Sequence, residues 1–378
     1  MRPKILAYYF PSWHADEKNE QWFGTGWTEW DLLRAAGPRF DGHRQPRVPA
    51  LGYTDQADPA AMAVDIDLAA DHGVDAFLFD FYWHEDGPFL NRELDEGFLG
   101  AANRPRLEFA LMWANHNWVD IFPAGADNNH RMLEEGTVGR EAFDAMTDHI
   151  VEHYFSQTEY LKVDGHPFFS IYEIGSLVRG LGGIEETKEA LADFTRKAIA
   201  AGHPGIHFDA VVWGFAVLPL AVTVGEPAEV IAQLELSSAS SYVWIHHVDL
   251  ADVGFPRADW PAVRDGAFAE YEVYNESMGV PFYPNVTVGW DSSPRTEQAA
   301  DFEYRGYPWY PVLDASPAEF RAGLETARDF ADEHSTPFVT INAWNEWTEG
   351  SALLPDTTHG LAYLEAIRDV FGLGRSTP

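Results

Sequence analysis

The runs Ala76-Phe77-Leu78-Phe79 and Phe338-Val339-Thr340-Ile341 are almost continuously apolar. A strand with one face in water alternates apolar and polar residues, whereas a continuous apolar run fits a strand that is covered on both faces. Helices cover both faces of a sheet mainly in proteins whose strands run parallel. The two runs therefore predict an α/β fold with parallel strands.

Similar runs recur along the chain and alternate with longer amphipathic stretches, which is typical of βαβ units. We expect strands at residues 4–10, 75–82, 108–114, 167–173, 208–215, 241–246, 282–290 and 337–344, and helices at residues 59–72, 91–102, 140–155, 185–201, 226–234, 261–277, 317–333 and 360–370. Asp58-Pro59 and Ser316-Pro317 mark two helix starts, because a capping side chain precedes a proline at the first helical position.

Eight strands alternating with eight helices predict a single (β/α)₈ TIM barrel over residues 1–378. A doubly wound sheet is the alternative, but no Gly-rich phosphate loop follows the first strand. The connection after the first strand, residues 11–58, is long, and structureless loops of that size are usually functional.

The composition narrows the possible partners. The formal net charge of −35 disfavours nucleic acid and anionic membranes, because both would be repelled. The chain has no cysteine and no apolar run long enough for a membrane span. Met1-Arg2-Pro3-Lys4 leads directly into an expected strand, which is too short for a signal sequence, so we expect a cytoplasmic protein. The composition carries no signal for the oligomeric state.

The ends of the expected strands carry the residues that suggest a function. Catalytic residues of a barrel lie just past the carboxyl ends of its strands. Nearly every expected strand end places a Trp or Tyr beside an Asn, Asp, Glu or His, which suits sugars because rings stack on C–H faces and polar groups bind hydroxyls. The substrate-binding candidates are Tyr9, Trp13, His14, Trp27, Glu29, His43, Gln45, Asp80, Tyr82, Trp113, Asn115, His116, Tyr172, Trp290, Asp291, Arg295, Trp344 and Asn345.

Glu346 and Glu349 are the candidate catalytic residues. They lie three positions apart just past the last expected strand, and a helical turn would put both side chains on one face. Paired carboxyl groups in a site of low dielectric constant divide into an acid and a base, as glycoside hydrolysis requires. The alternative is a pair of solvated glutamates at a helix N-terminus, where acidic residues are also favoured.

No cofactor and no metal ion are predicted. His14, His43, His116, His246 and His247 could in principle approach a metal, but no H-E-x-x-H pattern occurs. We expect these histidines to bind sugar hydroxyls instead.

Several motifs in chain order resemble the WbsX-like family. They are Tyr8-Tyr9-Phe10-Pro11-Ser12-Trp13-His14, Trp27-Thr28-Glu29-Trp30, Gly42-His43-Arg44-Gln45-Pro46, Trp113-Ala114-Asn115, Asp164-Gly165-His166-Pro167, Gly289-Trp290-Asp291 with Pro294-Arg295, and Ile341-Asn342-Ala343-Trp344-Asn345-Glu346-Trp347. That family is often labelled a glycosyltransferase of polysaccharide gene clusters. The segment Asn345 to Gly350 is also similar to the Asn-Glu-Trp-x-Glu-Gly motif of the family-99 glycoside hydrolases, the endo-α-mannosidases.

The resemblance implies separate roles for the two glutamates. Glu346 would act as a base on the sugar 2-hydroxyl, whose oxygen then attacks C1 to give a 1,2-anhydro sugar. Glu349 would protonate the leaving oxygen and later activate water, with net retention. Because the 2-oxygen must lie trans to the leaving group, this route selects 1,2-trans glycosides such as α-mannosides or α-rhamnosides.

Two positions depart from the family pattern. Relatives commonly carry Glu where this chain has His116, and they often place another Glu before Pro355, where this chain has Leu354. Both departures concern the substrate contacts rather than the glutamate pair.

Three functions follow as hypotheses. The first is a retaining hydrolase of an oligo- or polysaccharide with α-mannoside-like linkages. The second is a glycosyltransferase of surface polysaccharide assembly, which requires a nucleotide diphosphate site for which the chain offers no Gly-rich loop. The third is a carbohydrate-binding protein without catalysis, against which an intact glutamate pair argues.

The acidic composition predicts a response to salt. The chain has only five lysines, Lys4, Lys18, Lys162, Lys188 and Lys197, which suits a surface that stays hydrated in salt, although replacement of Lys by Arg in a GC-rich genome would give the same pattern. Salt adaptation predicts activity that is flat or rising up to molar NaCl, and a loss of activity there would contradict it.

Overall fold

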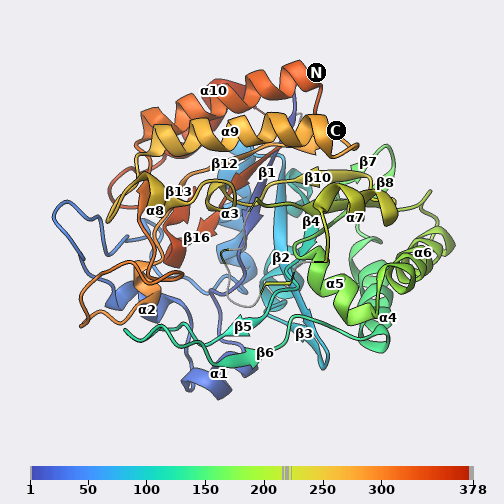
Figure 1. Ribbon diagram of the computed structural model, residues 1–378, viewed down its shortest axis with the longest axis horizontal. Coiled ribbons are helices and arrows are strands. Elements are labelled where there is room, and N and C mark those ends of the chain that lie inside the picture. The colour runs from blue at the N-terminus through green and yellow to red at the C-terminus, as the bar shows by residue number, and fades with distance from the viewer. Residues whose placement is uncertain (1, 215–216, 218–220, 223, 374–378) are drawn as a thin grey trace.

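The strands of the computed structural model, which describes residues 2–214, 217, 221–222 and 224–373, form a nearly closed parallel barrel (Figure 1). Neighbours around the barrel are, in order, β12 (Asn285–Thr287), β15 (Phe338–Asn342), β1 (Lys4–Tyr9), β2 (Ala76–His84), β4 (Glu108–Trp113), β8 (His166–Ile171), β9 (His207–Val211), β10 (Ser238–Ser240) and β11 (Phe282–Tyr283). The first and last of these flank Pro284, so one short segment joins the two edges of the sheet. The predicted (β/α)₈ barrel is confirmed.

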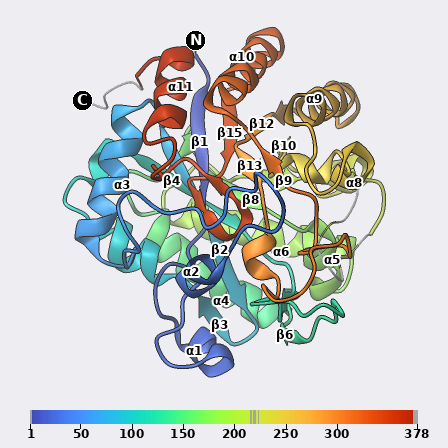
Figure 2. The ribbon, with the colours of Figure 1, turned by 90° about the vertical axis from the view of Figure 1, so that its left-hand side faces the viewer.

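The helices surround the strands, as Figure 2 shows for α3, α9, α10 and α11. Their bounds are α1 (Glu17–Phe23), α2 (Trp30–Ala35), α3 (Pro59–Asp71), α4 (Arg140–His149), α5 (Ile174–Leu181), α6 (Ile184–Ala200), α7 (Pro227–Gln233), α8 (Leu250–Val253), α9 (Trp260–Ser277), α10 (Pro317–His334) and α11 (Ala362–Phe371). Asp58 caps α3 through Ala60 N, and Ser316 forms a capping box with Glu319 on α10, so both predicted helix starts are confirmed.

Short antiparallel strands lie outside the barrel. They are β3 (Gly87–Phe89), β5 (Trp118–Val119), β6 (Met132–Glu134), β7 (Lys162–Val163), β13 (Gly289–Trp290), β14 (Leu313–Asp314), β16 (Asn345–Glu346) and β17 (Ser351–Ala352). In the described ranges, no helix is long and apolar enough to cross a membrane.

The sixth strand is shifted from its predicted place at 241–246. The strand is β10, three small residues earlier, and residues 244–246 form a 3₁₀ turn. The hydroxyls of Ser238 and Ser240 both donate to the buried Asp209 carboxylate, so polar side chains fill the barrel interior here. The apolar run at residues 241–246, which was expected to be the strand, therefore lies in the loop that follows β10.

Other boundaries also differ from the predictions. The expected helix 91–102 is a π-helix over Glu93–Phe98, and the helix 140–155 becomes a π-helix after α4. The expected strand 282–290 divides into β11, β12 and β13, and the loop 11–58 contains α1 and α2. The fifth strand was expected to reach residue 215, which lies outside the described residues, as do residues 1 and 374–378 of the expected domain.

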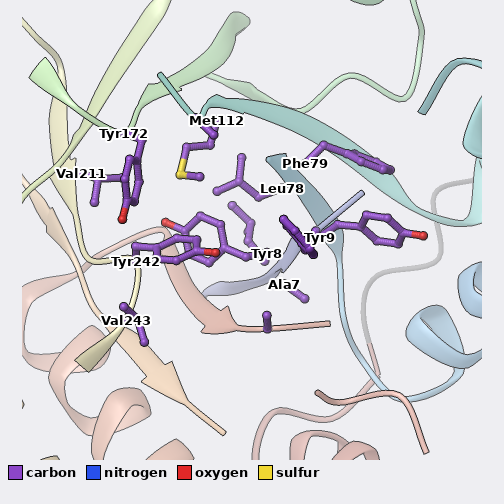
Figure 3. Packing of buried hydrophobic residues seen from close by; sticks show 14 of the residues in the cluster. Ala7, Tyr8, Tyr9, Leu78, Phe79, Met112, Tyr172, Val211, Tyr242 and Val243 are labelled. Carbon is purple, nitrogen blue, oxygen red and sulfur yellow. The ribbon is translucent and has the colours of Figure 1, made fainter. Parts of the chain in front are cut away.

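Side chains alternate between the two faces of the barrel wall. Tyr8 and Tyr242 meet inside with ring centroids 4.6 Å apart, and Tyr172 lies 5.3 Å from Tyr242 (Figure 3). Tyr9, the next residue along β1, packs instead on Phe79 at 4.6 Å, on the other side of the strands. Tyrosine rings thus fill the barrel interior at this level, and the carboxyl ends of the strands, where barrel sites are found, lie beyond them.

Two asparagines hold neighbouring backbone segments at this end of the barrel. Asn345 Oδ1 accepts from Phe10 N at 2.8 Å, and its Nδ2 donates to Phe10 O at 3.0 Å. Asn115 makes the same pair of bonds to Glu173, both at 2.8 Å. Each side chain satisfies a buried N–H and a buried C=O, which are costly to leave unpaired.

We predict that Asn115→Ala lowers the free energy of unfolding by about 1–3 kcal/mol, because it leaves the buried N–H of Glu173 without its partner, while the Glu173 carbonyl oxygen keeps the hydrogen bond from Leu177 N. Urea denaturation followed by circular dichroism measures the change. Asn129→Ala, at an exposed position, is the control and should change the value by less than about 0.5 kcal/mol. Equal stabilities for the two variants would contradict the role given to Asn115.

Candidate active site

Glu346 and Glu349 lie together at the carboxyl end of β15. Glu346 ends β16, and Trp347–Glu349 form a single 3₁₀ turn. Residues three apart eclipse one another in a 3₁₀ turn, so the two carboxyl groups share one side. They are only 2% and 6% exposed. The alternative of two solvated glutamates at a helix start is therefore wrong.

One guanidinium group bridges the two glutamates. Arg295 Nη2 donates to Glu346 Oε1 at 2.8 Å, and Nη1 donates to Glu349 Oε1. Nη2 also lies 3.0 Å from Glu29 Oε2. The rings of Phe10 and Phe122 lie 5.5 and 5.4 Å from the guanidinium carbon and exclude water from it. A single buried cation therefore faces three carboxyl groups.

The two glutamates hold their protons differently. Burial raises the pKa of Glu346 well above its usual range, and the neighbouring charge of Glu349 raises it further, against the lowering effect of Arg295. Burial also raises the pKa of Glu349, but Arg295 and the Tyr307 hydroxyl, which donates to Oε1 at 2.6 Å, oppose the rise. In the unliganded site the contacts thus favour a proton on Glu346 and a charge on Glu349.

Further contacts fix the segment that carries the glutamates. Thr348 Oγ1 donates to Glu29 Oε2, and Asp291 N donates to the carbonyl oxygen of Glu349 at 2.5 Å. Gly350 has φ of 67°, and a Cβ there would lie 2.5 Å from Asp291 Cβ. Only glycine tolerates both the conformation and the close approach, which accounts for the glycine that follows Glu349.

Asp291 itself is held by two residues of the loop after β1. His43 Nε2 lies 2.8 Å from Asp291 Oδ2, and Gln45 Nε2 donates to the same oxygen at 2.7 Å. Burial alone would raise the pKa of Asp291, but the hydrogen bond and charge of His43, with the charge of Arg47, hold it well below its usual range. These contacts thus favour the charged form of Asp291 behind the glutamates.

A pocket with about 710 Å³ of empty space, part of it open to solvent, lies above these groups. It is lined by residues from almost every strand end: Phe10, Asp80, Tyr82, Met112, Ala114, His116, Asn117, Trp118, Val119, Ile121, Phe122, Tyr172, Val217, Tyr242, Ile245, His246, Trp290, Arg295, Tyr307, Glu346 and Glu349. Rings and hydrogen-bonding groups thus surround both glutamates, as a sugar site requires.

Several buried polar atoms of the lining lack a hydrogen-bond partner within the described residues. They are Asp80 Oδ1, Trp118 Nε1, Trp290 Nε1 and His246 Nδ1. Burial raises the pKa of Asp80 well above its usual range, against the hydrogen bond that its Oδ2 accepts from Tyr242. Unpaired donors and acceptors of this kind suit a ligand that carries hydroxyl groups.

The predicted site residues fall into three groups. Asp80, Tyr82, His116, Tyr172, Trp290, Arg295, Glu346 and Glu349 line the pocket, and Glu29, His43, Gln45 and Asp291 stand directly behind it. The structure places Tyr9, Trp13, His14, Trp27, Trp113, Asn115, Trp344 and Asn345 outside the lining, so their prediction as substrate-binding residues is corrected.

These eight residues have structural contacts instead. Trp13 packs on Trp30 at 4.1 Å, and His14 Nδ1 lies 2.9 Å from Glu93. Trp27 packs on Phe23 and Trp113 on Phe143. Trp344 Nε1 donates to Asp65 at 3.0 Å, while Tyr9, Asn115 and Asn345 make the contacts given above. Tyr9 and Trp113, the last residues of β1 and β4, face away from the barrel interior because neighbouring positions of a strand face opposite sides.

The lining includes residues that were not candidates at the sequence level, among them Tyr242, Phe122 and Tyr307. Tyr242 lies two residues after the end of β10, a strand that was not placed correctly. Phe122 and Tyr307 belong to long loops, and the sequence does not show which loop residues fold back onto the strand ends.

Among the described residues, no group of three or more His, Asp or Glu side chains is arranged to hold a metal ion.

Solved structures of glycoside hydrolases share this fold. A "glycoside hydrolase-like protein" matches with a TM-score of 0.63 and 13% identity, covering 98% of this chain and 94% of that one. The GH99 endo-α-mannosidase of Bacteroides thetaiotaomicron, in complex with bis-tris-propane, matches with a TM-score of 0.58 and 14% identity, covering 96% and 94%. These likenesses show that the chain has a glycoside hydrolase-like TIM barrel.

The chain belongs to the WbsX family, since the family model described as "Glycosyltransferase WbsX" matches residues 5–367. It is also 30% identical over 369 residues to the uncharacterized protein WxcX of Xanthomonas campestris pv. campestris, in two strains. The match covers 96% of this chain and 49% of the relative, so the chain spans about half the length of the curated relatives it matches.

We predict that Tyr307→Phe raises the pH at which activity is lost on the acid side. The Tyr307 hydroxyl stabilises the charged form of Glu349, so its removal raises the pKa of Glu349, and the pair becomes doubly protonated at a higher pH. The pH profile of kcat/KM measures the shift. Tyr310→Phe, which removes a hydrogen bond to Asp249 on the same loop, is the control. An equal shift of the acid side of the pH profile in both variants would contradict the prediction.

Proposed function

We propose that this protein is a retaining glycoside hydrolase that acts on α-mannoside-like, 1,2-trans linkages of an oligo- or polysaccharide. The observation that carries the proposal is the pair of buried glutamates, joined by one guanidinium group, at the base of a pocket with aromatic and hydrogen-bonding walls. Two adjacent carboxyl groups that share protons supply the acid and the base of glycoside hydrolysis.

The proposed reaction has two steps. Glu346 takes the proton of the 2-hydroxyl, the 2-oxygen forms a bond to C1, and the bond from C1 to the leaving oxygen breaks as Glu349 protonates that oxygen. Glu349 then takes a proton from water, whose oxygen attacks C1 and opens the anhydro ring, while Glu346 returns its proton to the 2-oxygen. Both carboxyl groups end as they began, and C1 keeps its configuration.

Substrate binding has to redistribute the proton of the pair. In the unliganded site the contacts favour a proton on Glu346, whereas the first step needs one on Glu349. A sugar 2-hydroxyl that donates to Glu346 stabilises its charged form, and the nearby negative charge then favours protonation of Glu349. The pair thus becomes competent for the reaction only with a hydroxyl in place.

The family description favours a second function, a glycosyltransferase. A transferase must bind a nucleotide diphosphate, yet of the residues described as lining the pocket, Arg295 alone carries a permanent positive charge, and that charge is already engaged by Glu29, Glu346 and Glu349. Tight binding of nucleotide sugars in calorimetry would favour the transferase. Binding of polysaccharide without any turnover would favour a carbohydrate-binding protein.

The roles of the two glutamates can be separated by the leaving group. We predict that Glu349→Gln lowers kcat/KM about 10²–10⁴-fold on a polysaccharide but much less on an activated aryl glycoside, whose leaving group needs no protonation in the first step, while sugar binding survives. Glu346→Gln should lower activity on both substrates. The exposed Glu297→Gln is the matched control. If Glu346→Gln instead spares the activated aryl glycoside and Glu349→Gln impairs both substrates, the two roles are exchanged.

Nuclear magnetic resonance of the first product provides the stereochemical check on the wild-type protein. The α-anomer should form first from an α-glycoside. A β-anomer as first product would exclude the retaining route, and cleavage by Glu349→Gln at the wild-type rate on every substrate would exclude Glu349 as the acid.

A further inference from the structure

Two chemically different kinds of side chain line the pocket. β15, β13 and their loops contribute Glu346, Glu349, Arg295 and Trp290. The end of β4 and the loops that follow β4, β9 and β10 contribute six aliphatic side chains: Met112, Ala114, Val119, Ile121, Val217 and Ile245. We call these six residues the aliphatic wall.

The polar groups beside the aliphatic wall are largely engaged within the protein. His116 Nδ1 lies 3.0 Å from the carbonyl oxygen of Asn117, and the Asn117 Oδ1 accepts from Gly136 N at 3.0 Å. His246 Nε2 lies 3.3 Å from the Tyr172 hydroxyl. Burial lowers the pKa of His116 to about 4 and also lowers that of His246, so both rings are neutral at pH 7.

Such a wall discriminates between substituents of a sugar. A methyl group gains from leaving water against aliphatic side chains, whereas a hydroxyl placed there loses its hydrogen bonds to water. A hexose carries a hydroxymethyl group at C5, and a 6-deoxyhexose carries a methyl group in its place. The hydroxyls of either sugar can meet the unpaired Asp80 Oδ1, Trp118 Nε1 and Trp290 Nε1.

We propose that the substrate is a glycan of 6-deoxyhexose residues and that the aliphatic wall receives their methyl groups. The proposal rests on the proposed function, which assigns α-mannoside-like linkages with the 2-hydroxyl trans to the leaving group. Together the two requirements define 6-deoxy-α-mannosides, which are α-rhamnosides, in preference to the α-mannosides themselves.

Matched substrate pairs test the proposal. Aryl 6-deoxy-α-mannosides and aryl α-mannosides of the same D or L series differ by one hydroxyl. We expect kcat/KM to be about 10- to 100-fold higher for the 6-deoxy member of the pair. Equal values, or a preference for the mannoside, would overturn the proposal while leaving a hydrolase in place. That result would follow if His246 Nδ1, unpaired among the described residues, bound the hydroxymethyl group.

Binding separates this proposal from the proposed function. If neither aryl glycoside is cleaved, the hydrolase assignment fails, and the methyl glycosides of the two sugars are compared by calorimetry with the unmodified protein. At least tenfold tighter binding of the 6-deoxy glycoside supports the proposal that the aliphatic wall receives the methyl group. Equal affinity, or binding of neither glycoside, overturns that proposal.

Val119→Thr tests the wall directly, because it changes one methyl to a hydroxyl with little change of volume. The new hydroxyl gives a hydroxymethyl group a partner, so the preference for the 6-deoxy substrate should fall about three- to tenfold. Val273→Thr, at an exposed position on α9, is the matched control and should leave the preference unchanged. If Val119→Thr leaves the preference for the 6-deoxy substrate unchanged, the aliphatic wall is not the cause of that preference.

Discussion

The buried guanidinium group of Arg295 is the contact on which the site depends. Glu29 lies far along the chain from Glu346 and Glu349, and the three carboxyl groups could not lie so close in an apolar environment without a shared cation. One positive charge does not neutralise three carboxylates, however. The imbalance adds to burial in raising the pKa of Glu346 and opposes the lowering effect of Arg295, and a proton that can move between two carboxyl groups is what acid–base chemistry uses.

The support around this contact is as important as the contact itself. Phe10 and Phe122 keep water from the guanidinium, and Asp291 holds the backbone of Glu349 while being held by His43 and Gln45. The loop after β1 thus serves the site from behind, although few of its residues reach the pocket. Its residues His43 and Gln45 position Asp291, and Glu29 positions Arg295.

The fold was predictable because covered parallel strands leave continuous apolar runs, as at residues 76–79 and 338–341. β10 escaped prediction because its Ser-Ala-Ser sequence fills the barrel interior with hydroxyls around Asp209. In the site, the glutamate pair was predictable from spacing and setting. Tyr9 was misplaced because its neighbour Tyr8 takes the inward position, and Tyr307 was missed because only the folded loop brings it to Glu349.

β15 has a consequence for how the site is assembled. It lies between β1 and β12, and the same segment continues directly into Glu346 and Glu349. Docking of this strand into the sheet therefore also brings the acid pair to the pocket. A chain in which the strand is not docked lacks both the link between β1 and β12 and the paired acids.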